Sequence, residues 1–411
     1  MAARPVWPGF EPTRVPLALF DRERTYLLRH PAPPEGFEPV RRRDGWWRSD
    51  FVPEAMRANT TVDVAGIPTA GVFLDPDRAL TPARVAALLL HEAFHVFERE
   101  KHPEWIANEV SLFTYPISDA SLLRLRRLET TALRRALTAP DSARRACWVR
   151  ESLRIRARRF QRLPEESVSY ERMTELHEGL ARYVERLAAS RSAPPSLPAE
   201  GFPPESVRER AYPVGRSLAI LLDALRPGWK VELERGDASS LDGLLRATVE
   251  ASPGRVCRST PDETRRALTV ARSDVAALAR ENRRKRAAFL EAPGWTVEVR
   301  APASALLFPA NFDPLNVRRL GGTEVLHTRW LVLRGPAGRI EVLNRPALTE
   351  GEGPHPLFGG VKRLRVTGLA REPALRRSGD TLRLSDEGLE LELRGVEAMR
   401  DGKTLRLVVG G

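Results

Sequence analysis

Two histidines and a glutamate, His91, His95 and Glu92, form an H-E-x-x-H motif. On a helix this spacing places the two imidazoles about 40° apart on one face, one turn from each other, so both can bind the same metal ion. Glu92 lies too far round the helix to ligate that ion, but it can act beside it as a general base. The motif therefore predicts one Zn2+ ion per chain, with His91 and His95 as ligands and Glu92 as the base.

The surrounding sequence predicts that the motif lies on a buried helix. Between Val85 and Phe97 the only polar side chains are those of the motif itself. Thr81 followed by Pro82 supplies an N-cap and a proline at the first helical position, and Pro103 stops the helix. Buried imidazoles and a buried carboxylate need partners, because an unpaired charge away from water costs several kcal/mol. A divalent metal would be such a partner.

The third ligand must come from elsewhere, because a catalytic zinc site usually takes three protein ligands and leaves a fourth position open. The metzincin pattern is excluded, since Glu98 and Lys101 stand where it requires glycine and histidine. His102 lies two turns from His95 along the axis and cannot easily reach the same ion. The remaining candidate is Glu178, on a segment of helical period that could also be a solvated acidic face.

The two segments together resemble a known group of enzymes. H-E-A-F-H followed downstream by E-G-L-A-R-Y, which starts at Glu178, is similar to the gluzincin metallopeptidases, such as the thermolysin-like proteases. The resemblance implies that Glu178 is the third zinc ligand and that the reaction is peptide-bond hydrolysis. Gly179 is a glycine inside a helix, and with Ala181 it is expected to let this helix come close to the helix of His91 and His95.

The same resemblance implies supporting residues that this chain only partly matches. The position four residues after Glu178 holds Arg182 rather than an acid, so Glu185 and Glu175 are the candidates for the carboxylate that orients a ligating histidine. Tyr212 stands at the start of an apolar helix and is placed like the tyrosine that gluzincins use to stabilise the transition state. A residue that merely packs at the helix entry is the competing interpretation of Tyr212.

These parts imply a hydrolytic mechanism. Zinc would lower the pKa of a water molecule towards 7, Glu92 would accept its proton, and one more donor would stabilise the oxyanion. Tyr212 is the first candidate for that donor, with His177 and Tyr183 as alternatives. Two histidines and a carboxylate also suit Fe(II), but such oxygenase triads lie on strands, so zinc is favoured.

Composition limits the other classes of function. The 411 residues carry a net charge of +12, but almost all the basic residues are arginine and no aromatic residues alternate with them. The arginine-rich stretch at residues 124–162 is therefore expected to be a solvated helix face, and no nucleic-acid partner is expected. The expected partner is a peptide or protein substrate. The pattern leaves the oligomeric state open.

Location and redox state are expected from the termini and the cysteines. The sequence contains no run of 18 apolar residues, so no transmembrane segment is predicted. The N-terminus lacks the charged and apolar regions of a signal peptide. A cytoplasmic location is the default expectation, with secretion as the alternative if a signal was removed. Cys147 and Cys257 are expected to be packing residues, although a bridge between them stays open.

The chain is expected to be an α+β multidomain protein. Residues 1–80 should form an N-terminal wrap with a β-hairpin at 60–74, residues 81–290 a mostly α-helical zincin-like hydrolase domain, and residues 291–411 an antiparallel β-sandwich. Apolar periodicity predicts helices at 119–138, 142–162, 166–190, 205–225, 240–249 and 260–290, and alternation predicts strands at 295–300, 325–334, 339–343, 361–366, 381–384, 389–393 and 404–409.

Two hypotheses compete with the zinc metallopeptidase. A basic, non-catalytic binding or scaffold protein would keep the metal for structure and would need a fourth protein ligand. A zinc hydrolase of non-peptide amides would use the same catalytic groups on another substrate. The motifs also leave open whether cleavage would be internal or at a chain end.

Overall fold

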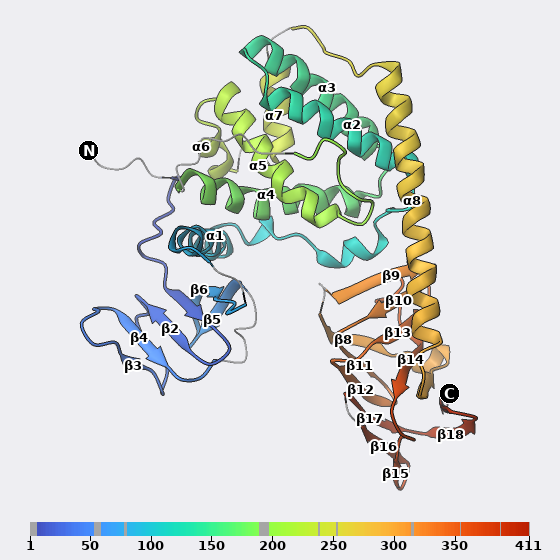
Figure 1. Cartoon of the computed structure of the whole chain (residues 1–411). Coiled ribbons are helices and arrows are strands. Elements are labelled where there is room, and N and C mark those ends of the chain that lie inside the picture. The colour runs from blue at the N-terminus through green and yellow to red at the C-terminus, as the bar shows by residue number, and fades with distance from the viewer. Residues whose placement is uncertain are drawn as a thin grey trace. The chain divides into compact units, whose positions relative to one another are not determined.

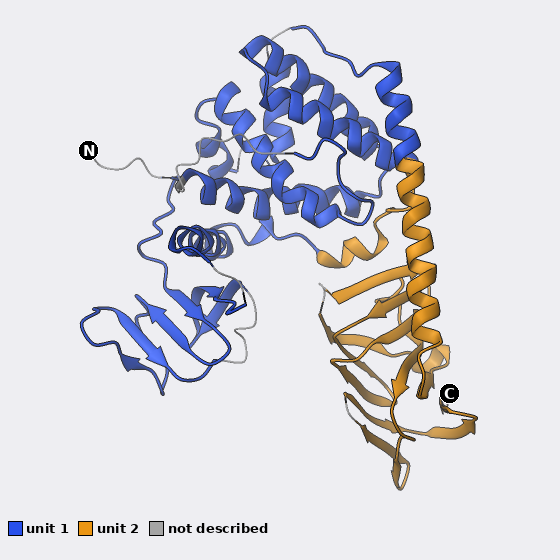
Figure 2. Cartoon of the chain, in the orientation of Figure 1, with its two compact units in different colours: residues 1–108, 121–270 blue, residues 109–120, 271–411 orange. Residues whose placement is uncertain are grey.

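The computed structural model describes residues 6–52, 59–77, 80–188, 197–236, 239–251, 254–313, 316–353, 355–386 and 388–410. The protein has the expected α+β multidomain fold, with an N-terminal sheet, a set of helices and two C-terminal sheets (Figure 1). The chain divides into two compact units (Figure 2). The first comprises residues 1–108 and 121–270, and the second comprises residues 109–120 and 271–411.

The N-terminal sheet has six strands in the order β3-β4-β2-β1-β6-β5. They are β1 (Leu17–Phe20), β2 (Thr25–Leu28), β3 (Glu38–Pro39), β4 (Trp46–Ser49), β5 (Thr60–Val64) and β6 (Ile67–Phe73). The predicted hairpin is confirmed: β5 and β6 pair antiparallel, and the turn residues Ala65 and Gly66 have positive φ angles. The hairpin is part of a larger sheet, because β6 also pairs with β1. That pairing is parallel, so the sheet is mixed. Strand β5 lies at its edge.

Eight α-helices are described. They are α1 (Pro82–Lys101), α2 (Ala120–Leu137), α3 (Ser142–Phe160), α4 (Glu165–Ala188), α5 (Val207–Leu225), α6 (Trp229–Glu234), α7 (Leu241–Glu250) and α8 (Pro261–Leu290). The predicted helices are confirmed to within about two residues at the ends that the structure describes. The last two residues predicted for α4, 189 and 190, lie outside the described residues.

Helix α1 begins and ends where its sequence signals predict. The Thr81 side chain accepts a hydrogen bond from the Arg84 backbone N–H at 3.3 Å, and Pro82 occupies the first turn. The helix ends at Lys101, two residues before Pro103. Its buried stretch runs from residue 91 to residue 98 and therefore includes the whole H-E-x-x-H motif.

Two glycines let α4 and α5 approach closely. A Cβ atom added to Gly179 would lie 2.6 Å from the Cα of Gly215, and one added to Gly215 would lie 2.2 Å from the carbonyl oxygen of Glu175. Neither site can accept a side chain without moving backbone. The sequence correctly indicated close packing at Gly179, but the helix that it admits is α5.

A cluster of buried ion pairs joins four helices of the first unit. Its members are Glu129 on α2, Arg156 and Arg159 on α3, Glu171 and Glu175 on α4, and Arg210 on α5, all at most 1% exposed. Glu129 accepts hydrogen bonds from all three arginines, and its pKa is held well below its usual range because the arginine charges outweigh the effect of burial. The expectation of a solvated arginine face is therefore wrong for Arg156 and Arg159, since their charges are paired inside the protein.

Replacing Glu129 by glutamine should lower the free energy of unfolding by about 3–5 kcal/mol, because three buried arginines would keep two carboxylates between them. Urea unfolding followed by circular dichroism would measure the change. Glu166→Gln, at an exposed position of α4, is the control and should stay within about 0.5 kcal/mol of the wild type. Equal stabilities for the two variants would contradict the role assigned to the cluster.

The first unit also contains a disulfide bond, between Cys147 on α3 and Cys257 in the segment before α8. The sequence left this bridge open and expected packing residues. The bond closes a loop of 110 residues, and cross-links of this kind stabilise a fold by restricting the unfolded chain.

The C-terminal strands form two sheets that pack as a sandwich. One has the order β18-β19-β7-β14-β13-β10-β9 and the other β15-β16-β17-β12-β11-β8. The strands are β7 (Trp295–Arg300), β8 (Phe308–Phe312), β9 (Val317–Gly321), β10 (Glu324–His327), β11 (Trp330–Gly335), β12 (Gly338–Leu343), β13 (Ala347–Gly351), β14 (Val361–Leu369), β15 (Leu375–Ser378), β16 (Thr381–Asp386), β17 (Leu389–Arg394), β18 (Val396–Asp401) and β19 (Thr404–Val409).

The sandwich differs from the prediction in three respects. Strands β8, β9, β13, β15 and β18 were not predicted. Strands β7 and β19 pair in parallel, so the first sheet is mixed rather than purely antiparallel. The strand predicted at 325–334 is two strands, β10 and β11, and the chain crosses from one sheet to the other between them. Both strands are apolar because both face the shared core. The sequence pattern therefore gave no sign that the chain changes sheets between them.

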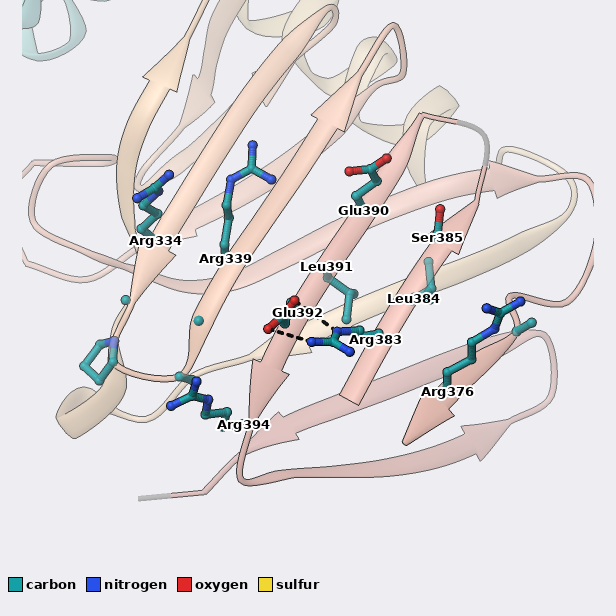
Figure 3. Close-up of a pocket in the computed structure, with 15 residues that line it drawn as sticks. Arg334, Arg339, Arg376, Arg383, Leu384, Ser385, Glu390, Leu391, Glu392 and Arg394 are labelled. Carbon is teal, nitrogen blue, oxygen red and sulfur yellow. Dashed lines mark hydrogen bonds and ion pairs between the residues drawn. The ribbon is translucent and has the colours of Figure 1, made fainter. Parts of the chain in front are cut away.

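The outer face of the second sheet carries a hollow of about 970 Å3 lined largely by charged side chains (Figure 3). Alternation along β16 and β17 turns Leu384 and Leu391 inward and Arg383 and Glu392 outward, where Arg383 donates to Glu392 at 3.0 Å. A polar outer face is what an antiparallel sheet with one side in water requires. No group of metal-ligating side chains occurs there among the described residues.

Candidate metal centre

Helices α1 and α4 bring together three potential ligand atoms. The Nε2 atoms of His91 and His95 are 3.2 Å apart, and the Oε2 atom of Glu178 lies 3.6 Å from the first and 3.5 Å from the second. The three residues are only 6%, 9% and 8% exposed. His91, His95 and Glu178 could therefore hold a metal ion between them.

Arg208 on α5 orients the carboxylate of Glu178. Its Nη2 atom donates to Glu178 Oε1 at 2.7 Å, so Oε2 is the oxygen that faces the histidines. Burial alone would raise the pKa of Glu178, but hydrogen bonds from His91 and His95 and the charge of Arg208 hold it well below its usual range. The carboxylate is thus ionised, as a metal ligand must be. Arg208 was not predicted as a site residue, and its only sequence signal is that it precedes Tyr212 by one helical turn.

Glu98 holds the other side of the His95 ring. It is fully buried, accepts a hydrogen bond from His95 Nδ1 at 2.7 Å, and lies 2.8 Å from Nδ1 of His177. Burial would lower the pKa of His95, but the hydrogen bonds to Glu178 and Glu98 raise it to about 10. A metal ion would replace the proton on Nε2, while Glu98 would keep the ring in position.

Glu98 was not predicted as a partner of His95, although its identity excludes the metzincin pattern. Its spacing of three residues after His95 was the available signal, because side chains three apart on a helix are neighbours. Glu98 also belongs to a second possible metal-ligating group, formed with His177 and the same His95. The two groups use opposite nitrogens of the His95 ring.

Replacing Glu98 by glutamine should weaken metal binding by about 10–100-fold, the usual effect of losing a partner that orients a ligating histidine. Competition with a chromophoric chelator would measure the dissociation constant for zinc. Glu100→Gln is the matched control, since Glu100 is exposed on the same helix. The positioning role of Glu98 would be wrong if both variants bound zinc as the wild type does.

The two carboxylates predicted to orient a histidine have different positions. Glu185 Oε2 lies 3.5 Å from His91 Nδ1 and is itself held by Arg182 at 2.9 Å, while Arg84 donates to its other oxygen at 2.6 Å. Burial acts to raise the pKa of Glu185, but the His91 hydrogen bond and the arginine charges lower it to about 2. Glu175 instead makes a two-pronged ion pair with Arg156 in the buried cluster, so it is not brought to the histidines.

Glu92 lies beside the three candidate ligands and is only 6% exposed. Burial raises the pKa of its carboxyl, and the nearby histidines offset that effect only in part. Its backbone carbonyl accepts a hydrogen bond of 3.4 Å from the Thr61 hydroxyl of strand β5. A carboxylate with a raised pKa is better suited to accept a proton near neutral pH than an exposed one.

Tyr212 lies next to Glu178 on the α5 side of the centre. Its hydroxyl accepts a hydrogen bond from Arg208, and burial together with the charge of Glu178 raises its pKa. The alternative donor Tyr183 points elsewhere, since its hydroxyl donates to Asp223 at 2.7 Å. His177 lies near the centre but its Nδ1 atom faces Glu98.

His102 lies outside this centre, as the sequence predicts. Its ring stacks on Trp105 with centroids 3.8 Å apart, and its Nε2 atom is 3.1 Å from Glu234 Oε2. The face of the His102 ring is thus covered by an aromatic ring, and its Nε2 atom faces a carboxylate. His102 is therefore a packing residue at the end of α1.

Comparison of the chain with protein-family models, curated proteins and solved structures gives no match. In the described parts of the chain, no helix combines the length and the apolar composition needed to span a membrane.

Proposed function

We propose that this protein is a zinc-dependent hydrolase that cleaves peptide bonds. The observation that carries the proposal is the triangle formed by His91 Nε2, His95 Nε2 and Glu178 Oε2, with sides of 3.2, 3.5 and 3.6 Å. Bonds of 2.0–2.1 Å to a tetrahedral zinc ion place neighbouring ligand atoms about 3.3 Å apart. The triangle supports zinc with one coordination position left over.

That open position favours catalysis over a structural metal. Structural zinc sites are usually closed by four protein ligands. Among the described residues, no fourth histidine, cysteine, aspartate or glutamate joins the group of His91, His95 and Glu178. A non-catalytic scaffold is therefore the weaker alternative.

The residues of the centre have separate roles in the proposed reaction. When bound, zinc would supply a Lewis acid that polarises a carbonyl group and acidifies water. Glu92 accepts the proton of the attacking water and delivers it to the leaving amine. Glu98 holds the imidazole ring of His95, Glu185 lies 3.5 Å from that of His91, and burial of the cluster excludes bulk water.

Tyr212 and Arg208 are the candidate donors to the charge that would develop on the carbonyl oxygen. Both lie beside Glu178, and Arg208 already donates to its Oε1 atom. Hydrogen-bond donors aimed at a developing oxyanion are worth about 2.7–4 kcal/mol each when they are held in place. We propose Tyr212 as the donor and Arg208 as the residue that positions it.

An extended peptide is the favoured substrate over other amides. Strand β5 lies at the edge of its sheet, and Thr61 and Asp63 tie it to α1 through Glu92 and Arg99, at 3.4 and 2.9 Å. An exposed strand edge can pair with an extended peptide through main-chain hydrogen bonds. Such pairing would carry the scissile bond along the helix that bears the motif.

The disulfide bears on where the protein works. Disulfides persist in oxidising compartments and are rare in the cytosol. The Cys147–Cys257 bond therefore favours the secreted alternative over the cytoplasmic one.

Metal analysis combined with peptide cleavage tests the proposal. The purified chain should contain one zinc ion, cleave casein or a quenched fluorescent peptide, lose this activity with 1,10-phenanthroline, and regain it when zinc is restored. Cleavage that survives complete removal of metal would reject the zinc mechanism. Binding that is independent of zinc and falls steeply with salt, without cleavage, would instead support the basic binding protein.

A further inference from the structure

A cavity of about 420 Å3 lies between side chains of α4 and α5. Its lining is strongly basic and consists of Arg182, Arg208, Glu209, Tyr212, Pro213 and Arg216. Three arginines against one glutamate give the wall an excess of positive charge. A cavity of this size accepts a side chain or the end of a peptide rather than a folded partner.

The cavity shares residues with the candidate metal centre. Arg208 donates to Glu178 at 2.7 Å, and Arg182 donates to Glu185 at 2.9 Å, so two lining arginines touch carboxylates that contact the histidines. Tyr212, the proposed oxyanion donor, forms part of the same wall. A group bound in the cavity would therefore lie close to the scissile bond of a substrate at the centre.

Arg216 differs from the other two lining arginines. Within the described part of the chain it makes no hydrogen bond or ion pair, and its Nε atom is buried without a partner. Burial and repulsion from Arg186 and Arg182 lower its pKa, and the charge of Glu185 offsets this only in part. A partly buried guanidinium beside like charges is stabilised when an anion completes the site.

We propose that this cavity is a subsite for a carboxylate group of the substrate, bound by the guanidinium of Arg216 with help from Arg182. The planar fork of arginine matches a carboxylate with two parallel hydrogen bonds. This inference rests on the proposed peptidase function and narrows its substrate class to peptides with an acidic group near the scissile bond. The carboxylate is either an acidic side chain or the C-terminus of the peptide.

Binding to a non-cleaving form separates these sources. Zinc-loaded Glu92→Gln protein would be titrated with acetylated, amidated peptides of alanine that carry one glutamate or one glutamine, scanned through each position. Pentaalanine with a free C-terminus would be compared with its amide. We expect the preferred carboxylate peptide to bind about tenfold more tightly than its neutral counterpart, the effect of one charge-assisted pair. Preference for glutamate indicates a side-chain subsite, and preference for the free terminus indicates a terminal one.

Substitutions at Arg216 test the assignment. Arg216→Gln should abolish the tenfold discrimination and leave the dissociation constant of the neutral peptide unchanged, while Arg216→Lys should restore part of it. Arg266→Gln, which removes an equally positive side chain from an exposed position of α8, is the matched control. Zinc content and circular dichroism would verify that each variant is folded.

The outcomes distinguish this inference from the function on which it rests. Equal binding of charged and neutral peptides, or discrimination that persists in Arg216→Gln, would overturn the carboxylate subsite even if the wild type cleaves peptides. Absence of cleavage by the wild type, together with Arg216-dependent discrimination, would overturn the peptidase proposal and leave the carboxylate subsite standing.

Discussion

Glu92→Gln protein is expected to bind zinc as the wild type does and to cleave peptides about a hundred- to ten-thousand-fold more slowly. Glutamine has the shape of glutamate but cannot accept a proton from the attacking water. The loss should appear in kcat and kcat/KM alike, because proton transfer occurs in the transition state. Steady-state cleavage of a quenched peptide, with zinc content measured on the same sample, tests this directly.

Glu100→Gln is the matched control for this substitution. Glu100 lies on the same helix and is exposed, so the same chemical change there should leave kcat within about twofold of the wild type. The mechanism fails if Glu92→Gln protein is as active as the control. A variant that has lost its zinc would show instead that Glu92 supports the metal, and the general-base role would then be withdrawn.

Glu178→Ala protein is expected to lose both zinc and activity. The substitution removes one of three ligand atoms and leaves Arg208, which pairs with Glu178 at 2.7 Å, facing the two histidines with its positive charge. Zinc affinity should therefore fall by more than the roughly 10–100-fold expected for a carboxylate that only orients a histidine. Competition with a chromophoric chelator gives the dissociation constant.

Glu166→Ala, at an exposed position of the same helix, should bind zinc normally and controls for the loss of a carboxylate from α4. Full zinc occupancy in Glu178→Ala would disprove the ligand assignment. If zinc binding then depended on Glu98 and His177, the ion would belong to the second group, which reaches His95 through its other nitrogen.

The helix that carries the motif could be predicted from sequence because its determinants are local. Thr81, Pro82 and Pro103 set its ends, and the apolar run between them made it a buried element. The adjacency of His91, Glu92 and His95 needs nothing more than the 3.6-residue period of a helix. The same locality explains why most of the helices and strands that were predicted lie within a few residues of the observed ones.

The role of a residue was harder to predict where it depends on which helices pack against each other. Glu175 and Glu178 lie on one helix that is buried almost all round, and no period separates a carboxylate that faces a metal from one that faces an arginine cluster. Glu175 pairs with Arg156 on α3, whereas Glu178 faces the histidines of α1. The choice is made by long-range contacts that leave no local pattern.

The sequence by itself determined that two imidazoles and a carboxylate share a buried turn of helix, because spacing, capping and apolar flanks act within one element. Only the tertiary structure decided that Glu178 completes the triangle and that Glu98 accepts a hydrogen bond from His95. It also decided that Gly179 of α4 and Gly215 of α5 let these two helices, and the arginines of α5, come close. These relations join side chains that are distant in the chain, and their energies depend on burial and on charges contributed by other helices. They exist only once the helices have packed.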